Sequence, residues 1–219
     1  MLINMMRIGM KSVYYIAANN LMSASGLNGV YYFLHLICNV FVVRETCHMA
    51  LACFKNVNVL NEIELEKLYE IKHTIYGLHI YHIISYWDKL RRDDIIHHLL
   101  MIGVALPLTE FIPQTNLIAH NFFFLNGLPG MIDYLLLFYS RNGIISKNTE
   151  KRINKHLNLW IRCPGAIANA TLSLSMLLNN YSEMTTNQLL AGMVVVGCTF
   201  WNGIYFMEQI VTNTAILND

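Results

Sequence analysis

The sequence predicts an all-α fold, a multi-pass transmembrane helical bundle of about six spans, and three observations support this class. Apolar side chains make up 55% of the 219 residues and charged side chains only 13%, roughly half the ~25% of an average soluble domain. The apolar residues occur in blocks, several close to the ~20 residues that a helix needs to cross ~30 Å of hydrocarbon. Basic residues gather between alternate blocks, as the positive-inside rule predicts.

Composition also excludes other classes. The apolar excess argues against disorder, which requires low hydrophobicity and high net charge. A net charge of +1 provides no general attraction to nucleic acid. The five cysteines form no CxxC pair, so we expect buried thiols and no disulfide framework or zinc site.

We expect spans at six stretches, approximately residues 27–54, 68–87, 95–112, 117–139, 157–178 and 189–211. Arg44 and Glu45 either end the first span or lie within it. Six spans place the N-terminal segment, the 88–94 turn and the 141–156 loop on one side. Because these pieces are rich in Lys and Arg, we expect that side to be cytoplasmic and both termini to lie there.

Two domains follow from this map. Residues 1–26 form an N-terminal segment, cytoplasmic or lying along the membrane interface. Residues 27–219 form one compact transmembrane domain, since no linker, internal repeat or low-complexity tract divides them.

The first polar cluster is the run RRDDIIHH at 91–98, at the start of the third span. Ionisable groups are costly in hydrocarbon and usually face a bundle interior or a wet cavity. Helical spacing places Asp93 one turn before His97 and Asp94 one turn before His98. Each carboxylate is therefore expected to orient an imidazole, as in acid–base pairs. The alternative is that the acids cap the helix and the histidines are interfacial.

The second cluster lies in the fourth span, where Asn126 and Asp133 share a helix face. Pro129 and its flanking glycines are expected to loosen or kink this helix. Either the polar pair serves a site, or it fastens the bundle by interhelical hydrogen bonds. Among lesser candidates, His82 shares a face with His79, and Arg162 either binds an anionic headgroup or reaches the cytoplasmic interface.

Two enzyme classes are disfavoured. The histidines do not supply the several HxxxH and HxxHH boxes of a di-iron membrane enzyme, so no metal is expected. No nucleophile elbow of a serine or cysteine hydrolase is present either.

Three segments from residue 68 onward carry a family resemblance: HIYHIISYWDKLRRDDIIHHLLMIGVALPL, NFFFLNGLPGMIDYLLLFYSRNG and EKRINKHLNLWIRCPG. Together they resemble the TLC-domain family, which includes the ceramide synthases and the translocating-chain-associated membrane proteins. The resemblance implies about six spans around a central, lipid-accepting cavity. In ceramide synthases the paired histidines belong to the site that transfers an acyl group from acyl-CoA to a long-chain base. Carried over, His97 and His98 form the catalytic pair and Asp133 is their partner.

From the residues and the resemblance together we expect a lipid-handling membrane protein, acting as an acyl-CoA-dependent acyltransferase on a sphingoid or related lipid. The residues expected to contact the lipid or acyl-CoA are Asp94, Arg91, Arg92, Asn126, Arg162 and His82. The alternative is a non-enzymatic regulator of lipid composition, a trafficking factor or a translocation accessory protein. Membrane lipid and acyl-CoA are the expected partners, with no bound cofactor and with oligomerisation left open. The family resemblance favours the endoplasmic reticulum or another endomembrane, that of a host cell included.

Overall fold

A computed structural model describes residues 2–55 and 60–215 of the chain; the remaining residues of the two predicted domains lie outside the described part. Every regular element there is a helix, which confirms the all-α class. The first three helices are α1 (Leu2–Ala24), α2 (Val30–Ala52) and α3 (Glu62–Tyr86), and a short 3₁₀ turn, η1 (Trp87–Lys89), follows them.

Three further rods each join a π-helical segment to α-helix, and a single long helix ends the described chain. The first rod is α4 (Arg92–His97), η2 (His98–Ala105) and α5 (Leu106–Leu108). The second is α6 (Asn116–Phe122), η3 (Phe123–Gly127) and α7 (Leu128–Arg141). The third is α8 (Lys147–Leu157), η4 (Asn158–Arg162) and α9 (Cys163–Asn179). A 3₁₀ turn, η5 (Tyr181–Glu183), leads to α10 (Thr186–Ala215).

Three helices are long and apolar enough to cross a membrane by length and composition: 116–141, 147–179 and 186–214. They match three of the six predicted spans, and the other three stretches are also helical. The charged pair of the first stretch lies within α2, where Arg44 and Glu45 form an ion pair at 2.6 Å. The 141–156 segment, expected as a loop, is helical from Lys147 because Ser146 caps α8 by accepting from the Thr149 amide at 3.0 Å.

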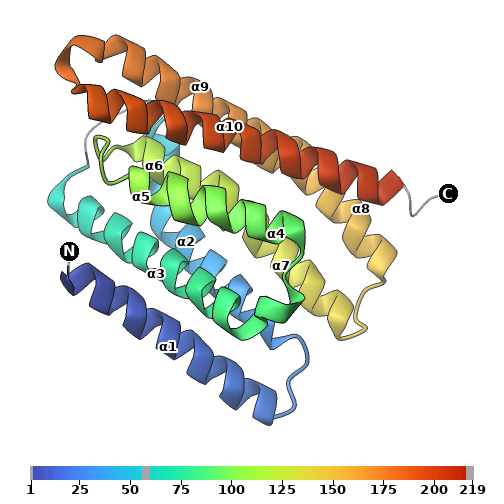
Figure 1. Ribbon diagram of the computed structural model, residues 1–219. Helices are drawn as coiled ribbons and strands as arrows, with labels where there is room; N and C mark the ends of the chain where they lie inside the picture. The colour runs from blue at the N-terminus through green and yellow to red at the C-terminus, as the bar shows by residue number, and fades with distance from the viewer. Residues whose placement is uncertain (1, 56–59, 216–219) are drawn as a thin grey trace.

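The predicted N-terminal segment forms α1, which packs along α3 in the same direction (Figure 1). Near its start, Arg7 and Lys11 each form an ion pair with Glu70 at 3.3 Å. Near its end, Asn19 accepts from the hydroxyl of Tyr81 at 3.0 Å. The two cations thus lie toward the beginning of α3. The topology predicted from the sequence placed these two cations on the same side as the 88–94 turn, which is at the other end of α3.

Two ends of the bundle can therefore be distinguished. The basic end contains loops 25–29, 90–91 and 142–146 and the last residues of α10, with Lys and Arg concentrated in 89–92 and 141–155. The opposite end contains the start of α1, the end of α2, the start of α3, and loops 109–115 and 180–185. The start of α1 and the end of α10 thus lie at opposite ends of the bundle (Figure 1).

Each π-helical segment is followed, two residues after its end, by a proline: Pro107 after η2, Pro129 after η3 and Pro164 after η4. Proline lacks an amide hydrogen, and its ring clashes with the carbonyl four residues earlier, which in each case lies in the π segment. The widened turns accommodate that clash. The expected loosening around Pro129 is confirmed, and the same cause acts in two other rods.

Candidate functional site

One pocket lies among α3, the 92–115 segment, α6, η3, α9 and α10, with a volume of about 60 Å³. Among the described residues that line it, none comes from α1, α2, α7 or α8, so the pocket is not at a centre common to all helices. On α10 the lining extends from Gly192 to Asn202, a length of ~15 Å at 1.5 Å per residue.

The lining is mostly apolar, its polar members are amides, hydroxyls and one imidazole, and no lining residue is Asp, Glu, Lys or Arg. The polar members are His97, Thr109, Thr115, Asn121, Asn126, Asn169, Ser173, Thr199 and Asn202. His97, Asn126 and Asn202 lie toward the basic end. Ile112 and Leu177 are among the apolar residues toward the opposite end.

An interhelical hydrogen-bond network crosses the wall of this pocket. Asn121 Nδ2 donates to Asn169 Oδ1 at 3.0 Å and to Thr199 Oγ1 at 2.7 Å. Asn169 Nδ2 in turn donates to the Leu117 carbonyl at 2.8 Å and lies 3.2 Å from His120 Nδ1. The network ties α6 to α9 and α10. Interhelical bonding of this kind was the alternative considered for Asn126 and Asp133, and neither residue belongs to this network.

Two polar atoms at the basic end of the pocket lack such partners. His97 Nδ1 and Asn202 Oδ1 are buried and make no hydrogen bond. Asn202 is 3% exposed, and the two side chains lie close enough for the His97 ring to donate a hydrogen bond to Asn202 Oδ1. A neutral imidazole carries one N–H group, so a small approach of the two side chains satisfies Asn202 Oδ1 from within the protein.

The histidine pair belongs to a cluster of five imidazoles from α2, α3, α4 and η2. The ring centroid of His98 lies 5.6 Å from that of His97, 5.3 Å from His79 and 4.9 Å from His82. His35 lies 5.5 Å from His82. His98 and His82 do not line the pocket; His97 alone joins the cluster to it.

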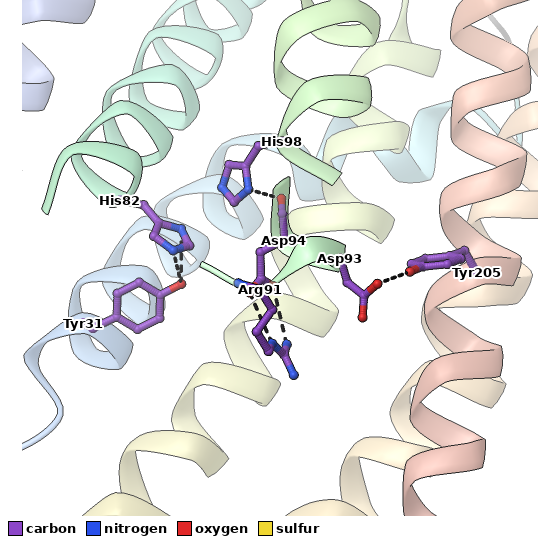
Figure 2. A network of polar contacts seen from close by, with 7 residues as sticks. All are labelled: Tyr31, His82, Arg91, Asp93, Asp94, His98 and Tyr205. Atoms are coloured by element: carbon purple, nitrogen blue, oxygen red, sulfur yellow. Dashed lines mark hydrogen bonds and ion pairs between the residues drawn. The ribbon is translucent and has the colours of Figure 1, made fainter. Parts of the chain in front are cut away.

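Three of these rings are held in the same way. Nδ1 of His35, His79 and His98 each bonds to the main-chain oxygen four residues earlier. A carbonyl oxygen only accepts, so these nitrogens carry the hydrogen and Nε2 is left as an acceptor. His98 Nε2 is buried without a partner. The Tyr31 hydroxyl lies 3.2 Å from His82 Nδ1 and closes the cluster toward α2 (Figure 2).

The predicted carboxylate–imidazole pairs do not form. Asp94 bonds through its carboxylate to Arg91, accepting from the Arg91 amide at 3.0 Å and from its guanidinium, and this bond raises the pKa of Arg91. Asp93 accepts from the Tyr205 hydroxyl of α10 at 2.8 Å (Figure 2). Both acids lie in the first turn of α4, where amide hydrogens and a tyrosine compete for them. Their capping role was the alternative interpretation.

Asp133 was expected to converge with the histidine pair. It faces Arg162, with which it interacts electrostatically, and Arg162 Nη1 also donates to Asn158 Oδ1 at 3.1 Å. Neither Asp133 nor Arg162 lines the pocket, and no described hydrogen bond joins Asp133 to His97 or His98. Arg162 lies near enough to attract the Asp133 carboxylate and to disfavour a positive charge on His97.

The remaining candidates divide between the pocket and the surface. Asn126 lines the pocket, whereas Arg91 and Arg92 are exposed at the basic end. Sequence reasoning missed Asn121 and Thr199, whose only signal was a polar side chain inside an apolar block. It also assigned no role to His35, because nothing in the sequence places α2 against α3.

Among the described residues, no group of three or more His, Cys, Asp or Glu side chains is arranged to hold a metal ion. Comparison with protein-family models, with curated proteins and with solved structures finds no match for this chain. The TLC resemblance therefore rests on the quoted segments alone.

Proposed function

We propose that this chain is a lipid-handling, multi-pass membrane protein whose pocket takes an amphipathic lipid. One observation carries the proposal: between apolar helices lies a largely apolar pocket, and the polar side chains of His97 and Asn202 line one end of it. A lipid supplies both kinds of contact, with a chain for the apolar lining and a polar group for the polar end.

The pocket has the length of one lipid chain in a leaflet but not its volume. Its length along α10 is ~15 Å, close to half of the ~30 Å hydrocarbon thickness, which is the depth of one leaflet. Its volume of about 60 Å³ is smaller than the ~150 Å³ cavity that admits benzene, so a chain enters only when the helices move apart. Both η2 and η3 border the pocket, and π-helical turns of this kind concentrate at functional sites.

The basic end faces the cytoplasm in this proposal, because the positive-inside rule applies to the loops gathered there. The C-terminus is then cytoplasmic. The N-terminus lies on the other side, because α1 runs the length of α3 and crosses with it. This differs from the expectation that both termini are cytoplasmic, which assumed that residues 1–26 lie outside the bundle.

Tags at the two ends, probed after permeabilising only the plasma membrane, are expected to be accessible at the C-terminus alone. Equal access at both ends contradicts the arrangement.

Acyl transfer from acyl-CoA is the catalytic form of this function. One observation favours it: His97 faces the pocket near the basic end, where exposed Arg91 and Arg92 are available to attract phosphates. His97 then acts as the general base or transient acyl acceptor. Because Asp93 and Asp94 bond elsewhere, no carboxylate orients the imidazole. The non-enzymatic alternative needs only the pocket. In both forms an endomembrane such as the endoplasmic reticulum is the proposed location.

The test compares lipid profiles of cells expressing the wild-type protein, the double variant His97→Ala/His98→Ala, and a control. His156→Ala is the matched control, because His156 is exposed on α8 and outside the pocket. If the protein is an acyltransferase, the wild type and the control should change the amounts of the same acylated lipids, and the double variant should not. A shift retained by the double variant refutes catalysis and leaves lipid handling. No shift with any of them, together with no lipid retained on purification, refutes the proposed function.

A further inference from the structure

The helix α8 carries a basic surface that takes no part in the pocket. Four of its eleven residues are cationic: Lys147, Lys151, Arg152 and Lys155. None of them lines the pocket. We infer that this α8 basic surface binds the headgroup of a polyanionic phospholipid in the cytoplasmic leaflet, a phosphoinositide that carries several phosphates. The inference rests on the membrane orientation of the proposed function and adds a second lipid site to it.

The opposite face of α8 fixes this surface in place. Glu150, Asn154 and Leu157 are buried, and α8 packs against α7 and α10. Ser146 caps the first turn of the helix by accepting from the Thr149 amide. The positive-inside rule requires only that Lys and Arg lie near the ends of spans. It does not require them on one side of a capped and packed helix.

The cations of the surface have few acidic partners. Lys151 lies 3.6 Å from the Glu150 carboxylate, whereas Lys147, Arg152 and Lys155 form no ion pair within the described part of the chain. The three lysines follow one another at intervals of four residues, and Arg152 comes three residues before Lys155. Like charges at these spacings repel each other and destabilise a helix. A bound polyanion removes that repulsion.

The surface also lies at the depth of lipid headgroups. The apolar part of this rod begins at Leu157, and Trp160, which is 70% exposed, occupies the interfacial position that tryptophan favours. At 1.5 Å per residue, Lys155 and Arg152 lie ~3 and ~8 Å beyond Leu157 along the helix, and Lys147 lies ~15 Å beyond it. The headgroup layer on each side of a bilayer is ~5–8 Å thick. The first two cations therefore meet the lipid phosphates, and Lys147 extends beyond them.

This spread of positive charge favours a phosphoinositide over other anions. Phosphatidylserine has one net negative charge at one depth, whereas the ring of a phosphoinositide carries further phosphates away from the bilayer. A lipid also fits the apolar neighbours of the cations. Ile153 and Trp160 are seven residues apart and share an exposed helix face. An acyl chain packs against that face, and an acidic peptide has no such chain to place there.

The experiment is native mass spectrometry of the full-length protein released from detergent micelles and titrated with lipids that share the same acyl chains. The lipids are phosphatidylinositol 4,5-bisphosphate, phosphatidylserine and phosphatidylcholine. We expect one molecule of the bisphosphate to bind at least tenfold more tightly than phosphatidylserine. Its affinity should fall as the ionic strength rises, because exposed charges are screened by salt.

Double substitutions test the assignment to α8. Lys147→Gln/Arg152→Gln removes two exposed cations, and each Lys or Arg near an anionic surface contributes about a fivefold factor in binding. Affinity for the bisphosphate should therefore fall about 25-fold. Lys147→Arg/Arg152→Lys keeps both charges and should bind like wild type. The matched control is Lys55→Gln/Lys67→Gln, which removes the same charge at the opposite end of the bundle and should also bind like wild type.

A third pair, Lys89→Gln/Arg92→Gln, removes two exposed cations at the basic end but outside α8. An equal loss of affinity from this pair and from the α8 pair indicates a diffuse positive charge and overturns the inference. Equal binding of phosphatidylserine, or of an acidic peptide of the same charge, overturns it as well, as does an α8 pair that binds like wild type. Each of these failures leaves the pocket proposal intact, because no residue of α8 lines the pocket.

Discussion

Replacing Asn169 by leucine isolates the contribution of the polar network to the stability of the bundle. The side chain is 2% exposed. It makes three contacts across helices: with the Leu117 carbonyl at 2.8 Å, with Asn121 at 3.0 Å and with His120 at 3.2 Å. Leucine has nearly the same size and removes all three.

The expected loss follows from measured interhelical bonds in membranes, which average about 0.6 kcal/mol each. Three of them predict that Asn169→Leu lowers the free energy of unfolding by about 2 kcal/mol. Partner groups left unpaired, such as the Leu117 carbonyl, increase that figure, because they stay buried without a new partner. The loss should appear as an earlier transition with an unchanged slope.

The assay is equilibrium unfolding in mixed micelles, with increasing SDS and tryptophan fluorescence as the signal. Asn179→Leu is the matched control, since it is the same substitution at an exposed position at the end of the same helix. The control should unfold within about 0.5 kcal/mol of wild type. If Asn169→Leu unfolds with the control, or if both variants are destabilised alike, the network does not hold α6 to α9 and the reasoning is wrong.

Two more stability predictions use the same assay. Lys72 is buried and donates to half-exposed Glu110 at 2.6 Å and to Gln114 at 3.0 Å. Glu110→Leu removes the counter-ion and leaves the amide oxygen, so it should cost up to about 3 kcal/mol. Lys72→Met leaves a carboxylate that water can reach and should cost clearly less; the reverse order contradicts the argument. A Cβ at Gly203 would lie 2.6 Å from Ala166 Cβ, so Gly203→Ala should force α9 and α10 apart and lower the free energy of unfolding by about 1–3 kcal/mol. Gly197→Ala is the control on the same helix: its added Cβ meets nothing within 4 Å, and the variant should be neutral or slightly stabilised. Equal effects of the two substitutions would refute the close approach of α9 and α10 at Gly203.

Hydrophobic blocks predicted the helices well, because burial of apolar side chains and satisfaction of backbone groups act locally along a span. The same patterns did not report how α1 packs. Its charges, Arg7 and Lys11, suggested an interfacial segment, and the structure pairs both of them with the single carboxylate of Glu70 on α3. That pairing joins residues more than fifty positions apart, so no local pattern reports it. The prolines were informative, and the widened turn before Pro129 was predictable because its cause lies within four residues.

The candidate site was predictable only in part, and for the same reason. Helical spacing placed Asp93 and Asp94 one turn from the two histidines, but spacing does not say which partner a carboxylate chooses. Asp93 accepts from the hydroxyl of Tyr205, which lies on another helix, and Asp94 accepts from the amide of Arg91. His97 and Asn126 line the pocket, whereas Asp133 lies outside the lining and near Arg162 on η4.

The polar side chains that line the pocket differ in where their hydrogen bonds go. Asn121 and Asn169 line the same pocket as Asn202, but their side chains form hydrogen bonds between α6 and α9. A polar residue that only fastens helices should resemble Asn169, with its atoms paired within the protein. Asn202 and His97 lie close to each other at one end of an uncharged pocket. Other buried polar atoms without a close partner, such as His98 Nε2 and Asp133 Oδ1, belong to residues outside the lining. The place of Asn202 and His97 in the pocket, and not a missing hydrogen bond, therefore makes them the candidates for contact with an occupant.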